Sequence, residues 1–209
     1  MTMEFYVAEP PAAVADGCVA VYRAAFGRPP YSETAVDAEL LRERVTRYAR
    51  RDGFRLATVN QDGNVAAFAL AVRAYPGDWW RDNVAKAIGP QLTARWLPPG
   101  VLEVVHVAVD PDRQRQGFGR ALLAAVIQDL DPAVSSATLS CDRNAIPAQR
   151  LYLSEGWQLI TDQMSFGPEM EPRWLMGIDL QPGPSTAHAR TADLPVTAEG
   201  PEQVPGAPS

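Results

Sequence analysis

The stretch VLEVVHVAVDPDRQRQGFGRALL (residues 101–123) is the most informative part of the sequence for the fold of this chain. Its first nine residues, VLEVVHVAV (101–109), are rich in β-branched side chains and predict a strand. Gly117 and Gly119 follow in a turn, where the absence of a Cβ lets the backbone come close to a ligand. A helix is expected next, from about residue 117 to residue 130, with its apolar residues on one face. The stretch therefore predicts a strand, a glycine turn and a helix in direct succession.

The expected helix aims its free N–H groups, and roughly half a positive charge, back at the glycine turn. This arrangement binds an anion, above all a phosphate, and Arg115 and Arg120 add charge at the rim. A dinucleotide-binding turn needs a third glycine where Leu122 stands, and the Gly-Lys-Ser/Thr ending of a nucleoside triphosphate loop is also absent. Glycines that only turn a strand into a helix remain the alternative.

On both sides of this stretch, residues 1–180 read as strands alternating with helices, which predicts an α/β layered domain. Further strands are expected at residues 4–8, 54–59, 65–72, 137–141, 157–166 and 174–180, and helices at residues 12–26, about 34–51, about 82–88 and 147–154. Ser32 is the expected N-cap of the second helix. The segment 181–209 holds prolines at 182, 184, 195, 201, 205 and 208 and no aromatic residue, so it is expected to be a disordered tail.

Charge and composition exclude few functions, but they favour some partners and locations over others. A net charge of −6 argues weakly against nucleic acid as a partner and suits a cationic acceptor, although mild acidity also simply favours solubility. The chain has no run of about 18 apolar residues and no charged leader, so we expect no membrane segment and a cytoplasmic location. Cys18 and Cys141 make neither a disulfide framework nor a metal quartet, and no metal is expected.

Two blocks of sequence carry a family resemblance. The run QRQGFG (114–119), after the Asp110-Pro111 turn, resembles the acyl-CoA signature of the GNAT superfamily, Gln/Arg-x-x-Gly-x-Gly/Ala. The run NAIPAQRLYLSEGW (144–157) resembles the Asn…Ala…Leu-Tyr-x-x-x-Gly-Phe/Trp element of that superfamily. Three residues rather than two separate Asn144 from Ala148, which departs from the pattern and loosens the assignment of Asn144.

The resemblance implies an α/β GNAT fold, with a central mixed twisted sheet flanked by helices and splayed between its fourth and fifth strands, 101–109 and 137–141. The pantetheine of acetyl-CoA would enter that splay beside the backbone of Val107 and Val109, and the pyrophosphate would lie on the loop that begins at Gln114. The implied pyrophosphate donors are the backbone amides of Arg115, Gln116, Gly117, Phe118, Gly119 and Arg120, and Asn144 would bind the pantetheine arm.

The same resemblance implies two catalytic residues. Tyr152 matches the tyrosine that protonates or hydrogen-bonds the departing thiolate, with a packed aromatic residue as the alternative. Glu103 stands six residues before Val109, the spacing of the glutamate base in histone-type members, with a carboxylate at a strand end reaching solvent as the alternative. Strand alternation puts Glu103 on one face with Val105, Val107 and Val109, and His106 on the other as a satisfied core residue or a less favoured base.

The acceptor site is less defined. Trp79, Trp80 and Trp96, with Asp78 beside them, offer aromatic faces for a cationic amine or else pack over the core. Glu33 and Asp37 stand in a region that often shapes the acceptor site in the family, and they equally suit the electropositive end of a helix.

The favoured function is transfer of an acetyl group from acetyl-CoA to a primary amine, on a small molecule, by direct attack in a ternary complex. The alternatives are acetylation of a protein N-terminus or lysine and a non-catalytic acyl-CoA-binding module. The closing strands leave an edge with which a second copy can pair, so a homodimer is also left open.

Overall fold

The computed structural model describes residues 1–31, 33–167 and 170–180. The elements are, in chain order, β1 (Thr2–Tyr6), α1 (Ala12–Phe26), α2 (Ala35–Tyr48), β2 (Arg55–Gln61), β3 (Asn64–Ala74), α3 (Trp79–Trp96), β4 (Val101–Val109), a 3-10 turn (Pro111–Arg113), α4 (Phe118–Ile127), β5 (Ser136–Asp142), α5 (Ile146–Ser154), β6 (Gln158–Met164) and β7 (Arg173–Asp179). The expected tail, 181–209, lies outside the described residues. No helix within the described ranges has the length and apolar character needed to cross a membrane.

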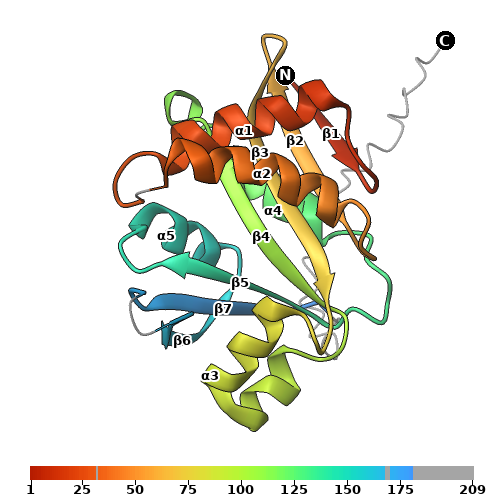
Figure 1. Ribbon diagram of the computed structural model, residues 1–209, viewed down its shortest axis with the longest axis vertical. Helices are drawn as coiled ribbons and strands as arrows, with labels where there is room; N and C mark the ends of the chain where they lie inside the picture. The colour runs from red at the N-terminus through yellow and green to blue at the C-terminus, as the bar shows by residue number, and fades with distance from the viewer. Residues whose placement is uncertain (32, 168–169, 181–209) are drawn as a thin grey trace, which may run out of the picture.

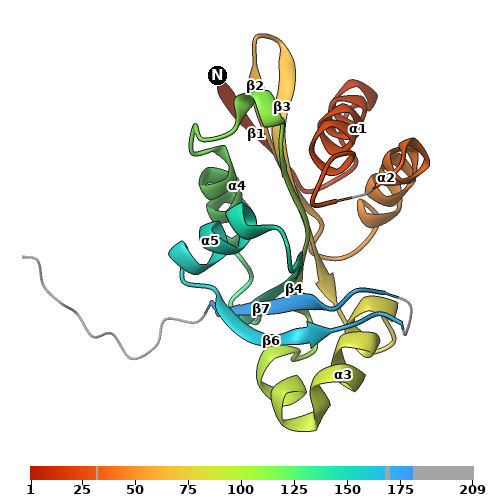
Figure 2. The same ribbon diagram turned by 90° about the vertical axis from the view of Figure 1, so that its left-hand side faces the viewer.

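One mixed sheet organises the molecule, with strand order β1-β2-β3-β4-β5-β7-β6. Figures 1 and 2 show α1 and α2 on one face of the sheet and α4 and α5 on the other, with α3 at the end beside β6. The apolar cluster of the first face includes Leu41, Phe54 and Phe68, and that of the second includes Leu122 and Trp157. Two helical layers around a mixed sheet confirm the predicted α/β fold class.

The sheet opens between β4 and β5, as predicted. These two strands are parallel, and their register holds only two pairs, Leu102 with Ala137 and Glu103 with Thr138. Beyond these pairs the two strands diverge, and Figure 1 shows β5 leaving β4 at an angle on its way to α5. The open wedge lies directly before the glycine turn and therefore next to the start of α4.

A β-bulge in β4 overturns the predicted distribution of its side chains. Leu70 of β3 pairs with His106, but the next residue, Ala71, pairs with Val104, so Val105 is an extra residue in β4. Val105 and His106 both lie on the α1 and α2 face, whereas Val107 packs on the α4 face. The prediction that Glu103 and His106 lie on opposite faces is therefore wrong, because strict alternation assumes an unbulged strand.

Two helix predictions also need correction. α2 is capped by Thr34, whose hydroxyl accepts the N–H of Asp37 while Asp37 accepts the N–H of Thr34, so the expected cap at Ser32 is wrong. α3 runs through Trp79–Trp96 rather than the short span 82–88, with a kink at Gly89, whose φ is 76°. Pro90 starts the second half of α3, because a proline is tolerated in the first turn of a helix.

Candidate active site

The glycine turn has the conformation that an anion site requires. Gly117 caps α4 with a φ of 84°, and Arg115 also has a positive φ, of 64°. A Cβ built on Gly117 would meet no atom within 4 Å, so the space over this residue is open to a ligand. A Cβ on Gly119 would lie 2.9 Å from Leu151 Cδ2, so this glycine lets α5 pack against the start of α4.

A cavity of about 830 Å³ lies over this turn and reaches into the open wedge of the sheet. Its lining includes most of the predicted cofactor residues: Val107, Val109, Gln114, Arg115, Gly117, Phe118, Gly119 and Arg120. Every charged residue in the described lining is an arginine: Arg28, Arg115, Arg120 and Arg150. An arginine rim over a helix N-terminus suits a ligand that carries several phosphates.

Two predicted cofactor residues, Gln116 and Asn144, lie outside the described lining of this cavity. The Asn144 side chain is exposed, and its backbone N–H donates to Asp142 Oδ1 at 2.8 Å. Arg120, which does line the cavity, donates from Nε to Glu155 Oε1 at 2.5 Å. The roles of Gln116 and Asn144 stay predictions.

A second cavity, of about 390 Å³, lies on the α1 and α2 side of β4. Its lining includes Glu103 and His106 on β4, together with residues of α2, the start of α3 and the end of β5. Tyr152 on α5 lines both this cavity and the arginine-rimmed one, as do Phe26, Tyr31 and Val107, so the two cavities meet at these residues. The bulge in β4 is what brings Glu103 and His106 to the same cavity.

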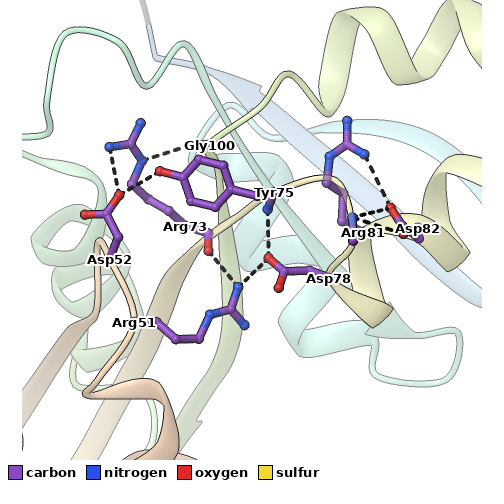
Figure 3. A network of polar contacts seen from close by, with 9 residues as sticks. Arg51, Asp52, Arg73, Tyr75, Asp78, Arg81, Asp82 and Gly100 are labelled. Carbon is purple, nitrogen blue, oxygen red and sulfur yellow. Dashed lines mark hydrogen bonds and ion pairs between the residues drawn. The ribbon is translucent and has the colours of Figure 1, made fainter.

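Glu103 is a buried carboxyl group, only 5% exposed. Burial raises the pKa of Glu103 to about 8, nearby Arg51 opposes the rise, and Asp78 adds to it. Figure 3 shows how these two neighbours are held: Arg51 donates to Asp78 at 2.5 Å and to the Arg73 carbonyl at 2.9 Å. Because Arg51 and Asp78 act on the pKa in opposite directions, burial is what lets the Glu103 carboxyl take up a proton near neutral pH.

Asp78→Asn is expected to lower the pKa of Glu103 by roughly one unit, because Arg51 then acts on the carboxyl without an opposing charge. The titration of the Glu103 carboxyl, followed by ¹³C NMR, measures the shift. Asp52→Asn is the matched control, since Asp52 belongs to the same network but bonds Tyr75 and Arg73 instead. A pKa that rises in Asp78→Asn, or moves equally in both variants, would contradict this explanation.

His106 is held as a neutral imidazole. Burial, with a further contribution from Arg44, lowers the pKa of His106 to about 3. Its ring packs edge-on against Tyr22, with ring centroids 5.2 Å apart, and its Nε2 is buried without a hydrogen-bond partner among the described residues. His106 is therefore not the satisfied core histidine that the sequence favoured, and it takes up a proton far less readily than Glu103 near neutral pH.

Tyr152 is buried, 7% exposed, and packs against Trp157 with ring centroids 6.1 Å apart. Burial raises the pKa of Tyr152, and the neighbouring Cys141 and Tyr31 add to the rise. Its hydroxyl consequently stays protonated and can donate a hydrogen bond at the junction of the cavities.

The aromatic residues divide into two groups. Trp79 and Trp80 line the second cavity, and Trp79 stacks on Phe166 with ring centroids 5.4 Å apart. Trp96 is buried and fills the space over Gly177, so it belongs to the core. Of the two acidic residues noted in the sequence, Glu33 lines the cavity and Asp37 caps α2.

The second cavity also holds three arginines that sequence reasoning missed, Arg44, Arg47 and Arg173. Arg44 and Arg47 stand three residues apart on α2, ahead of Tyr48, which also lines the cavity. Their spacing puts them on one helix face, and this was the available signal.

Comparison with known proteins agrees with this geometry. The model of the Acetyltransferase (GNAT) family matches residues 18–157. The [Ribosomal protein bS18]-alanine N-acetyltransferase of Escherichia coli K12 is 31% identical over 123 residues, 52% of this chain and 83% of that protein. The mycothiol acetyltransferase of Nocardiopsis dassonvillei is 34% identical over 147 residues, 70% of this chain, and the chain spans only 39% of that longer relative.

A solved structure of a GNAT-like decarboxylase in complex with isobutyryl-CoA superposes with a TM-score of 0.59 at 17% identity, covering 87% of this chain and all of that one. That likeness concerns the fold alone. With the family match over two thirds of its length, this chain belongs to the GNAT acetyltransferase family.

Proposed function

We propose that this protein transfers an acetyl group from acetyl-CoA to a primary amine of a small molecule, by direct attack in a ternary complex. The observation that carries the proposal is the position of Tyr152, which lines both the arginine-rimmed cavity and the cavity that holds Glu103. A site for an anionic acyl carrier and a site with a buried carboxyl group thus meet beside the Tyr152 hydroxyl, with Tyr31 as a second tyrosine that lines both cavities.

The arginine-rimmed cavity fits acetyl-CoA. Backbone N–H groups of the turn from Arg115 to Arg120 would hold the pyrophosphate, with the open space over Gly117 admitting it. Val107 and Val109 lie where β4 has lost its pairing with β5, so their backbone groups are placed to bond the pantetheine amides. Acetyl-CoA supplies the thioester that the amine attacks.

The catalytic residues follow from the second cavity. Glu103, with its pKa of about 8, accepts a proton from the acceptor ammonium group directly or through water. Tyr152, whose raised pKa keeps it protonated, donates to the thiolate as it leaves. Burial of both groups strengthens these interactions, because water does not compete for them.

The size of the second cavity favours a small acceptor. Its volume of about 390 Å³, lined by residues of α2 and the start of α3 and by Phe166, is within the range of sites for small molecules. Likeness to the bS18-alanine N-acetyltransferase favours a second candidate, acetylation of a protein N-terminus. A peptide acceptor needs room beyond its first residues, so the small volume of the second cavity favours the first candidate.

The proposed function is tested by measuring the release of thiol from acetyl-CoA in the presence of candidate acceptors: polyamines, aminoglycosides, aryl amines, amino acids and peptides. Tyr152→Phe is expected to lower kcat by about tenfold to one hundredfold, because the departing thiolate loses its proton donor. The KM for acetyl-CoA should change little.

Tyr75→Phe is the matched control, since Tyr75 lies outside both cavities and its hydroxyl bonds Asp52. An unchanged kcat in Tyr152→Phe would remove the tyrosine from the mechanism. Binding of acetyl-CoA without thiol release for any acceptor would instead support a binding module.

A further inference from the structure

The α2 wall of the second cavity holds two arginines that form no ion pair with any carboxylate in the described part of the chain. Arg44 and Arg47 both line the cavity, and no described carboxylate lies within 4 Å of either. Arg42, on the same helix but outside the cavity, pairs with Asp16. Arg44 is half-buried and close enough to His106 to lower its pKa, whereas Arg47 is exposed and lies over the Tyr48 ring at 5.5 Å.

Carboxyl groups in the described lining do not balance this charge. Glu103 is largely protonated near neutral pH, since burial raises its pKa to about 8. Asp142 lies opposite Arg173 in the β5–β7 register, and its Oδ1 accepts the backbone N–H of Asn144. Of the lining carboxyl groups, Glu33 is then left to offset Arg44 and Arg47. Asp37, whose pKa is lowered by its hydrogen bonds with Thr34 and further by Arg44, lies outside the lining and is bonded within the cap of α2, so the α2 side of the cavity carries excess positive charge.

A positive wall is an unexpected feature in a site for an amine. A simple ammonium ion would be repelled by Arg44 and Arg47, and little in the cavity would offset that repulsion while Glu103 is protonated. An acceptor with an acid group of its own would instead place that group on the guanidinium groups and turn its amine toward Glu103.

We propose that the acceptor is an amine that also bears an anionic group, a carboxylate or a phosphate, which Arg44 and Arg47 bind. This inference rests on the proposed function and names the acceptor class for the same site. Trp79, Trp80 and Phe166 also line the cavity and take the apolar remainder of such an acceptor.

Matched pairs of acceptors test the inference by thiol release. L-phenylalanine against 2-phenylethylamine varies only the carboxylate, and O-phosphoethanolamine against ethanolamine varies only the phosphate. The anionic member of a pair is expected to have a kcat/KM at least about tenfold higher, and the pair that shows the difference identifies the acid group.

Arg44→Met and Arg47→Met show whether the arginines cause that difference, because the amines within a pair also differ in their own pKa. Methionine keeps the long stem of arginine and removes its charge. Arg44→Met is expected to lower kcat/KM for the anionic acceptor by about tenfold to one hundredfold, mainly through KM, and thereby to remove most of the preference for the anionic member of the pair. Arg50→Met is the matched control, since Arg50 is exposed and outside the cavity.

Binding of the acetylated products gives a readout that does not depend on turnover. N-acetyl-L-phenylalanine should quench the fluorescence of Trp79 and Trp80 at lower concentration than N-acetyl-2-phenylethylamine, and the difference should vanish in Arg44→Met. Equal behaviour of both members of every pair in the wild type and in the Arg44 variant would overturn the acceptor class. Product binding of the expected kind without any thiol release would uphold the anionic site and refute the proposed function instead.

Discussion

Glu103→Gln is expected to lower kcat/KM for acetyl transfer by about one hundredfold to ten thousandfold, the range that a positioned general base contributes. Glutamine keeps the shape of the side chain but accepts no proton. In the wild type, the rate should rise as pH increases through about 8, because the carboxyl of Glu103 must lose its proton before it can act as a base. This limb of the pH–rate profile should disappear in the variant, while the affinity for acetyl-CoA stays the same.

The stability of the same variant separates loss of chemistry from loss of fold. The pKa of Glu103 is higher in the folded chain than its ordinary value of 4.5, so folding favours the protonated form and stability falls as pH rises from 4.5 through 8. Glu103→Gln removes this cost and should raise the free energy of unfolding at pH 9 by up to about 5 kcal/mol. Glu39→Gln, at an exposed residue paired with Arg23, is the control. Undiminished turnover in Glu103→Gln would show that another group is the base.

Gly117→Asp is expected to weaken the binding of acetyl-CoA by at least about one hundredfold, measured by calorimetry. The new side chain would enter the open space over the turn and set a negative charge where the pyrophosphate should lie. Aspartate tolerates positive φ better than most residues do, so the fold should be nearly unaffected.

The chain offers a matched control for that variant. Gly63, in the β2–β3 turn, has a φ of 78° and also has no atom within 4 Å of a built Cβ. Gly63→Asp therefore carries the same charge and the same backbone strain but lies outside the arginine-rimmed cavity. Comparable loss of affinity in both variants would mean that net charge, rather than the turn, accounts for the effect.

Local pattern was enough to predict the elements that carry the cofactor side of the site. The strand 101–109 and the helix 12–26 have the predicted bounds, since each is a strong run with a proline or glycine at its ends. The Gln114–Gly119 signature lies where a helix begins, and all of its residues except Gln116 line a cavity. These features depend on neighbours in sequence, which a pattern can show.

The acceptor side of the site depends on contacts between residues that are far apart in the sequence. Its arrangement was therefore harder to predict from the sequence. The bulge at Val105 is imposed by pairing with β3, so periodicity within β4 could not reveal that His106 and Glu103 share a face. The second half of α3 was not predicted, because Gly89 followed by Pro90 is a sequence pattern that usually ends a helix. In the structure these residues only kink α3. The Arg51–Asp78 pair joins residues from either side of the β2–β3 hairpin, which only the folded chain brings together.

The splay of the sheet affects how strongly ligand binding stabilises the folded protein. Two residue pairs between β4 and β5 join the strands β1 to β4 to the rest of the sheet, β5, β7 and β6. Peptide groups further along β4 and β5 therefore need a ligand or water as their hydrogen-bond partner. A ligand that fills this gap supplies the hydrogen bonds that a paired strand would make. Such a ligand stabilises the folded state by about 2.7 kcal/mol when present at one hundred times its dissociation constant. We therefore expect acetyl-CoA, the proposed ligand of this gap, to slow proteolysis, because the ligand-free protein should open more often between β4 and β5.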